Sequence, residues 1–230
     1  MKEIYLVRHG ETCWNKLKIL QGSSNDIDLN TTGEEQSLYT GKYLKNIKFD
    51  LVISSPMKRA KQTTEIICKE INYMNDIEYT EDLIELDYGL LACGKTEQEM
   101  QKNSIYNIYF DSLNSYNNIK DPIAKYHFFI KMQNILHDNY NIETSEQINM
   151  RTTNIIEKIK NSEANTILIV THYGVINSFI YNLFNVFEIP INTIYSKNCT
   201  ITYITYNNNK FELITSPNSL HFGIYNKNYN

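Results

Sequence analysis

The stretch Ile4-Tyr5-Leu6-Val7-Arg8-His9-Gly10-Glu11-Thr12 decides how this chain is expected to fold. A short apolar run that stops just before a glycine predicts a buried strand. Arg8 and His9 would then emerge at the carboxyl end of that strand, where open α/β sheets usually bind their ligands. A turn with an incidental histidine is the alternative interpretation of so short a motif.

The rest of the chain alternates between strand and helix patterns. Thr144, with Gln147 three residues later, has the pattern of a capping box at the start of a helix. Strands are predicted at 51–54 and 166–171, helices at 33–44, 57 to about 70, 144 to about 160 and from about 175, and a hairpin at 200–206 and 211–215. This order predicts an α/β fold with three layers, in which helices cover both faces of a mostly parallel central sheet, and an antiparallel edge lies near the C-terminus.

Charge and composition predict a single cytoplasmic domain spanning residues 1–230 and exclude several classes of partner. With 22 basic and 26 acidic residues, the net charge of -4 leaves no basic footprint for nucleic acid or an anionic membrane. No signal-peptide pattern follows Met1, and no apolar run approaches transmembrane length. The four cysteines have neither zinc-site nor disulfide spacing, so no metal is expected. The sequence does not indicate an oligomeric state.

Arginine is scarce in this chain, and its placement is informative. There are three arginines against nineteen lysines. Arg8 directly follows one apolar run, and Arg59 comes shortly after another. The guanidinium group offers a planar fork of donors that matches phosphate oxygens two at a time, which lysine cannot copy. The sequence therefore favours an anion site built from Arg8 and Arg59, against the alternative that both are surface cations.

Six motifs in a fixed order extend this interpretation along almost the whole chain. They are Leu6 to Asn15, Gln21-Gly22 with Asp26 to Gly33, Ser54-Ser55-Pro56 with Arg59 and Gln62-Thr63, Glu85 to Gly89, Glu143-Thr144 with Arg151, and Val170-Thr171-His172-Tyr173-Gly174-Val175-Ile176. In these motifs the chain resembles the histidine phosphatase superfamily, also called the phosphoglycerate mutase-like family. The resemblance implies a phosphotransfer enzyme that acts on a phosphorylated small molecule or a phosphoprotein.

The resemblance also implies roles for individual residues. A neutral imidazole suits attack on the phosphorus of a monoester dianion, and we assign this role to His9, which would form a phosphohistidine. Arg8, Arg59, His172 and Asn15 are expected to bind the transferring phosphoryl group, which carries its charge on three oxygens. The motifs add Gln21, Gly22, Tyr88 and Tyr173 to the expected phosphate and substrate contacts.

One carboxyl group is needed to protonate the leaving alkoxide and later to accept a proton from water. Glu85 is our choice because it opens the family-like Glu-x-x-Tyr-Gly pattern. Asp82 and Asp87 are nearby alternatives.

The family contains hydrolases and mutases, and the sequence favours hydrolysis. Mutases hold the carboxylate of a glycerate with adjacent arginines in the inserted cap, whereas this chain has no arginine between Arg59 and Arg151. The sequence Tyr173 to Ile176 is also closer to the phosphatase branch. Tyr88 and Lys95 resemble mutase contacts, so a 2,3-bisphosphoglycerate-dependent phosphoglycerate mutase is the alternative. No cofactor is expected for the hydrolase, and 2,3-bisphosphoglycerate would be needed for the mutase.

The aromatic-rich segment from about residue 96 to residue 140 breaks the alternation of strand and helix, and it predicts two helices divided near Asp121-Pro122. Since the family carries an insertion here that covers its site, we interpret the segment as a cap. A packed subdomain without a ligand role is the alternative.

Overall fold

A six-stranded sheet with the order β3-β2-β4-β1-β5-β6 forms the centre of the molecule. The computed structural model describes residues 1–89, 94–96, 137, 142–184 and 197–215. Its strands are β1 (Lys2–Arg8), β2 (Leu51–Ser54), β3 (Glu78–Tyr79), β4 (Thr166–Thr171), β5 (Ile201–Asn207) and β6 (Lys210–Thr215). The first four strands are parallel, whereas β5 is antiparallel to both β1 and β6. The predicted mixed sheet with an antiparallel C-terminal edge is confirmed.

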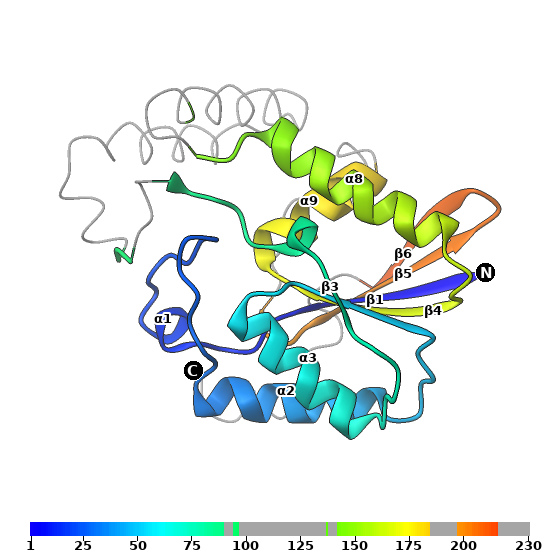
Figure 1. Ribbon diagram of the computed structural model, residues 1–230, viewed down its shortest axis with the longest axis horizontal. Coiled ribbons are helices and arrows are strands. Elements are labelled where there is room, and N and C mark those ends of the chain that lie inside the picture. Colours follow the sequence, from blue (N-terminus) through cyan, green and yellow to red (C-terminus); the bar gives the residue numbers. More distant parts are fainter. Residues whose placement is uncertain (90–93, 97–136, 138–141, 185–196, 216–230) are drawn as a thin grey trace.

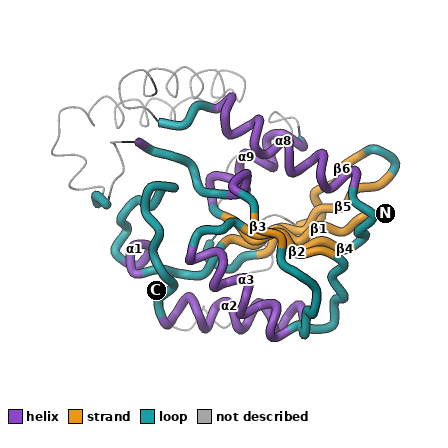
Figure 2. Tube along the Cα trace, viewed as in Figure 1, coloured by secondary structure: helices purple, strands orange, loops and turns teal. Residues whose placement is uncertain are grey.

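Helices cover both faces of this sheet (Figure 1, Figure 2). Helices α2 (Thr31–Leu44) and α3 (Lys58–Glu70) lie on one face, and α8 (Ser145–Asn161) and α9 (Tyr173–Leu183) lie on the other. Two short elements, α1 (Cys13–Lys16) and the 3-10 helix η1 (Glu81–Leu83), follow β1 and β3. The predicted three-layer arrangement is therefore confirmed.

The alternation of side chains along the central strands builds a separate core on each face. On β1, Ile4 and Leu6 pack with the residues of α8 and α9, whereas Val7 packs on the side of α2 and α3. Helix α3 contributes Ala60 and Ile67 to the second core, both fully buried as its helical period predicts. Burial on both faces fixes the register of these strands, because a one-residue slip would exchange the two cores.

Element boundaries agree closely with those expected from the sequence. The predicted capping box is present, since Gln147 N–H donates to Thr144 Oγ1 at 3.2 Å and Thr144 N–H donates to Gln147 Oε1 at 2.8 Å. Helix α9 begins at Tyr173, two residues earlier than expected, because His172 takes the extended N-cap conformation directly after β4. The hairpin turn places Asn208 and Asn209 at φ 48° and 62°, as a primed turn requires. Strand β3 and the two short helices were not predicted.

The predicted cap, including its two helices and the break at Asp121-Pro122, lies almost entirely outside the described residues. The assignment of one domain to residues 1–230 therefore stays a prediction. Within the ranges that the structure describes, no helix is long and apolar enough to cross a membrane.

Candidate active site

Three parallel strands that are neighbours in the sheet end at the same edge, and each is followed by a polar residue of the site. Strand β1 leads into His9, β2 into Ser55 and β4 into His172, with β4 lying between the other two. The rings of His9 and His172 have their centres 5.1 Å apart. Both side chains are buried, at 2% and 0% exposure. The expected convergence of the two histidines at the carboxyl edge of the sheet is confirmed.

The local contacts of His9 fix which ring nitrogen can react. Nδ1 lies 2.7 Å from the carbonyl oxygen of Gly10, which can only accept a hydrogen bond, so Nδ1 carries the proton. In the neutral ring the lone pair is then on Nε2. Burial lowers the pKa of His9 well below its ordinary value of 6.5, and the positive charges of Arg59 and Arg8 lower it further. Both effects favour the neutral form of the imidazole.

The backbone around His9 is held by two residues from distant parts of the chain. Thr63 Oγ1 on α3 accepts a hydrogen bond from Gly10 N–H at 2.9 Å. Asn198 Nδ2 donates to the carbonyl oxygens of His9 at 2.9 Å and Gly10 at 3.2 Å. Neither Thr63 nor Asn198 could be assigned a role from the sequence. Thr63 belongs to the motif that contains Arg59, whereas Asn198 belongs to none of the six motifs.

His172 is oriented by Ser55, a third residue to which the sequence alone gave no role. Its Nε2 lies 2.8 Å from Ser55 Oγ, and Ser55 Oγ also accepts from the N–H of Met57 at 3.3 Å. The hydroxyl can therefore give its own proton to Nε2, which leaves the ring proton on Nδ1. This buried Nδ1 has no hydrogen-bond partner among the described residues. Burial, followed by the charge of Arg59, lowers the pKa of His172 well below 6.5, and a bound phosphate dianion would oppose that shift.

Arg59 is the most deeply buried cation of the site, with 0% of its surface exposed. Its Nη1 and Nη2 donate to the carbonyl oxygens of Asn25 at 2.9 Å and Gly22 at 3.3 Å. Its Nε is buried without a hydrogen-bond partner, and no carboxylate of the described residues forms an ion pair with it. Glu85 and Asp26 favour its charged form through space without an ion pair. A buried guanidinium group with an unpartnered Nε therefore fits an anionic ligand.

The other predicted arginine, Arg8, is half-buried at the end of β1. Its guanidinium carbon lies 5.5 Å from the centre of the Tyr173 ring, within cation–π distance. Tyr173 is thus placed beside the site, as expected.

Glu85 is buried at 5% exposure, in the loop that follows η1. Its Oε1 accepts hydrogen bonds from the N–H groups of Leu86 at 3.0 Å and Gly174 at 3.1 Å, the latter in the first turn of α9. Burial raises the pKa of Glu85 above its ordinary value of 4.5, while those two N–H groups and Arg59 and Arg8 oppose the shift. A raised pKa keeps this carboxyl group protonated to higher pH than an ordinary glutamate, which suits a proton donor.

The two alternative carboxylates have other contacts. Asp87 Oδ1 accepts from Gly89 N–H at 2.8 Å, and Asp82 faces the side-chain amide of Asn154 at 3.4 Å. Both are half-buried, unlike Glu85. The described residues contain no group of three His, Cys, Asp or Glu side chains that could hold a metal ion.

The remaining predicted contacts lie around the same edge. Asn15 Oδ1 accepts from Asn198 Nδ2 and from Thr12 N–H, at 3.2 and 3.1 Å, so its amide is fixed next to the His9 loop. Gln21 is buried, and both polar atoms of its side chain lack a partner among the described residues. A Cβ on Gly22 would come within 3.0 Å of the Tyr88 ring, so these two residues lie in contact.

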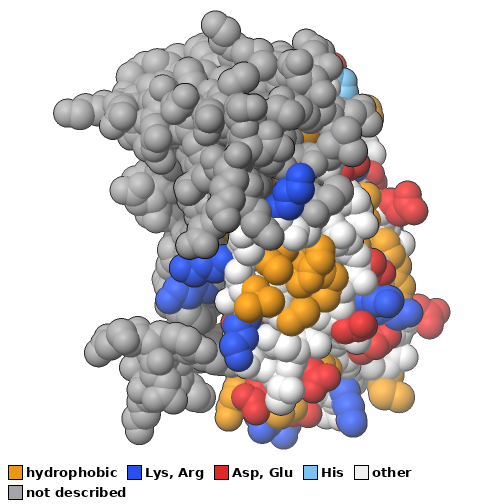
Figure 3. Space-filling view, turned by 90° about the vertical axis from the view of Figure 1, so that its left-hand side faces the viewer, with side chains coloured by type: hydrophobic (Ala, Val, Ile, Leu, Met, Phe, Trp, Pro, Cys, Tyr) orange, Lys and Arg blue, Asp and Glu red, His pale blue; other side chains and the backbone are white. Residues whose placement is uncertain are grey.

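Exposed charged side chains also lie at this end of the molecule. Figure 3 views the end of the molecule toward which β1 and its parallel neighbours point, where Lys and Arg side chains, together with Asp and Glu side chains, lie around a group of hydrophobic side chains. The lysines near the first and third motifs are exposed; they are Lys16, Lys18, Lys58 and Lys61. These lysines face solvent, whereas Arg59 is buried and Arg8 is half-buried.

The family model of the histidine phosphatase superfamily (branch 1) matches residues 4–120 and 120–218. The chain belongs to this superfamily. The family predicted from the motifs is therefore confirmed.

Within the histidine phosphatase superfamily the chain is similar to proteins that are named for different activities. It is 45% identical over 109 residues to the uncharacterized phosphatase PhoE of Bacillus subtilis, covering 47% of this chain and 54% of that protein. It is 45% identical over 92 residues to the probable fructose-2,6-bisphosphatase TIGAR A of Danio rerio, covering 39% and 36%. The matches thus span about half or less of these relatives. The fold resembles a phosphoglycerate mutase from Bacillus anthracis, with a TM-score of 0.74 at 22% identity over 94% and 92% of the two chains.

Proposed function

We propose that this protein hydrolyses phosphomonoesters of small metabolites or phosphoproteins through a covalent phosphohistidine on His9. The observation that carries the proposal is the placement of a buried guanidinium group, Arg59, near a buried neutral imidazole whose lone pair is on Nε2. The guanidinium would bind the phosphate dianion, and the neutral ring would attack it without charge repulsion.

In the first step, His9 Nε2 forms a bond to phosphorus while the ester P–O bond breaks. The phosphoryl oxygens are held by Arg59, Arg8, and the Nδ1–H of His172 during this transfer. The leaving alkoxide takes its proton from Glu85, whose raised pKa keeps a proton available for this purpose.

In the second step, water attacks phosphorus and the N–P bond breaks. Glu85, now a carboxylate, accepts the proton that water loses, and His9 is returned to its neutral form. The products are the free alcohol and inorganic phosphate. No cofactor takes part in either step.

The experiment that tests this proposal is chemical trapping of the intermediate. The protein is mixed with phosphate-labelled substrate and denatured at alkaline pH, where phosphohistidine survives. We expect label on the wild-type chain and none on His9→Ala. His137→Ala is the matched control, because His137 is another histidine, whose Nδ1 contacts the carbonyl oxygen of Ile142. Label that persists in His9→Ala would refute the proposed nucleophile.

A 2,3-bisphosphoglycerate-dependent phosphoglycerate mutase is the second candidate. The contact of Tyr88 with Gly22 supports it, since Tyr88 is the residue that resembles a mutase substrate contact. The two activities are separated by adding 3-phosphoglycerate together with 2,3-bisphosphoglycerate. Release of inorganic phosphate would support the hydrolase, whereas formation of 2-phosphoglycerate would support the mutase.

Small phosphorylated acids are suitable first substrates. Structural neighbours include phosphoserine phosphatase from Entamoeba histolytica, one structure in complex with phosphoserine and another with 3-phosphoglyceric acid, at 21% identity in both cases. Those names support a screen of small phosphomonoesters on this protein. Cytoplasmic residence and the exclusion of nucleic-acid partners stay predictions from the sequence.

A further inference from the structure

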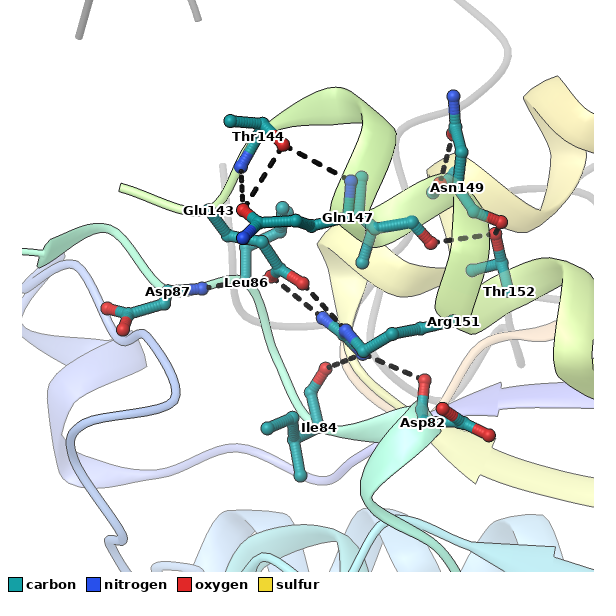
Figure 4. Close-up of polar contacts among 12 residues, drawn as sticks. Asp82, Ile84, Leu86, Asp87, Glu143, Thr144, Gln147, Asn149, Arg151 and Thr152 are labelled. Atoms are coloured by element: carbon teal, nitrogen blue, oxygen red, sulfur yellow. Dashed lines mark hydrogen bonds and ion pairs between the residues drawn. The ribbon is translucent and has the colours of Figure 1, made fainter. Parts of the chain in front are cut away.

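The third arginine of the chain, Arg151 on α8, makes a set of contacts beside the site (Figure 4). Its Nε and Nη2 donate to the two carboxylate oxygens of Glu143 at 2.6 and 2.8 Å. Its Nη1 donates to the backbone carbonyl oxygens of Asp82 at 2.8 Å and Ile84 at 3.1 Å. The two charged side chains are 15% and 12% exposed. Such a bidentate pair with little exposure is stronger and more rigid than a surface ion pair.

Glu143 extends these contacts to the other side of Glu85. Its backbone N–H donates to the carbonyl oxygen of Asp87 at 2.7 Å, and its Oε2 accepts from Asp87 N–H at 3.3 Å. We call Arg151 and Glu143 together the Arg-Glu clamp. The clamp holds backbone groups at positions 82, 84 and 87, so it brackets Glu85 from both directions.

Other contacts also hold the loop around Glu85, including the hydrogen bond that Ser23 N–H donates to the carbonyl oxygen of Leu86 at 3.1 Å. Residues 84–88 form no helix or strand, and the carboxyl group of Glu85 is held by the N–H groups of Leu86 and Gly174. Thr171 Oγ1 donates to the carbonyl oxygen of Leu83 at 2.7 Å, which adds one contact from β4. The clamp supplies three charge-assisted hydrogen bonds to the backbone of this loop, at Asp82, Ile84 and Asp87. A displacement of about 1 Å in a reacting group costs about 100-fold in rate.

We infer that Arg151 is a positioning residue, which acts through Glu143 and the loop backbone to hold Glu85 where it delivers a proton to the leaving group. Arg151 does not touch the substrate in this role. The inference rests on the proposed function, in which Glu85 is the acid and base.

The test compares two substrates that differ in their need for an acid. Glycerol 2-phosphate releases an alkoxide, which must be protonated, whereas p-nitrophenyl phosphate releases a phenolate, which leaves without a proton. For Arg151→Met we expect kcat/KM for glycerol 2-phosphate to fall by about 100-fold, with kcat/KM for p-nitrophenyl phosphate within about threefold of wild type. Arg151→Lys keeps a cation but not the fork, so it is expected to show the same selective loss at smaller magnitude.

Lys158→Met provides the matched control. Lys158 is also on α8 and pairs with Glu78, but both side chains are 44% exposed and neither contacts the Glu85 loop. This variant loses one ion pair of the same helix, and we expect both substrates to be turned over at the wild-type rate. Thermal unfolding of each variant is followed alongside, so that activity is compared for folded protein.

The outcomes separate this inference from the function on which it rests. If Glu85→Gln lowers kcat/KM equally for both substrates, the proposed role of Glu85 as the acid of the first step fails, because kcat/KM does not include the second step that both substrates share. If Glu85→Gln lowers kcat/KM selectively for glycerol 2-phosphate but Arg151→Met and Arg151→Lys lower kcat/KM equally for both substrates, the clamp is merely structural and the inference is overturned. In the double variant Arg151→Met with Glu85→Gln, we expect the second substitution to add less than about twofold, because residues acting as a unit are not additive.

Discussion

Replacing Gly174 by alanine is expected to displace the Glu85 carboxyl group without removing any catalytic side chain. A Cβ at Gly174 would lie 2.6 Å from Glu85 Oε1 and 1.9 Å from Leu86 Cδ1. To reach 3.0 Å, below which Cβ contacts are essentially never seen, the Glu85 oxygen must move by about 0.4 Å or more. The 3.1 Å hydrogen bond from Gly174 N–H to Glu85 would then be lengthened or lost.

The expected magnitudes follow from this displacement. Overpacking costs about 1–3 kcal/mol of unfolding free energy, and a shift of this size in a proton donor lowers kcat by roughly 10- to 100-fold. The assay is steady-state hydrolysis of glycerol 2-phosphate, together with urea unfolding to measure stability.

Gly41→Ala is the matched control for this substitution. Gly41 is buried on α2, and an added Cβ there would lie 2.7 Å from Glu70 Cβ on α3. Gly41→Ala therefore also overpacks a helix contact. Neither residue is among the groups placed at the site. We expect a comparable loss of stability with kcat unchanged. Wild-type kcat in folded Gly174→Ala would refute the argument that this close approach sets the position of Glu85.

Three further predictions concern the site. Because burial raises the pKa of Glu85 above 4.5, its proton-donating form persists to higher pH than in an ordinary glutamate. We therefore expect kcat/KM for glycerol 2-phosphate to fall as pH rises through that raised pKa. Glu85→Gln should remove this fall from the pH profile. Arg59→Lys should lower kcat/KM by about 100-fold or more and weaken inhibition by inorganic phosphate, because lysine lacks the planar fork; equal inhibition by phosphate would argue against Arg59 as the anion site. Asn198→Ala should lower the unfolding free energy by about 1–3 kcal/mol, because it leaves the carbonyl oxygens of His9 and Gly10 without this donor; an unchanged urea midpoint would count against it.

Much of the fold could be predicted because it is recorded in local patterns. Strands β2 and β4 occupy the predicted ranges, since uninterrupted apolar runs of this length are buried on both faces of a parallel sheet. The capping box at Thr144 was visible for the same reason, as its two partners are three residues apart. Strand β3 has only two residues, both exposed, so no hydrophobic period marks it.

Some residues of the candidate site could be placed from local sequence patterns, and others could not. His9, Arg8 and His172 could be placed from the sequence because each directly follows, or ends, a strand of the same parallel sheet, and such strands end at one edge. The contacts of Ser55 with His172 and of Asn198 with His9 join residues 117 and 189 positions apart. No pattern within a short window records such pairs.

The sequence by itself determined the family, the layer order and the residue types that suit phosphate chemistry, because hydrophobic period and motif spacing are local properties of the chain. Only the tertiary structure decided that Glu85 is buried while Asp82 and Asp87 are half-buried, that the His9 proton is on Nδ1, and that Arg151 holds the Glu85 loop instead of joining the anion site. The physical reason is that protonation and side-chain orientation depend on burial and on neighbours brought together by folding, which are distant in sequence.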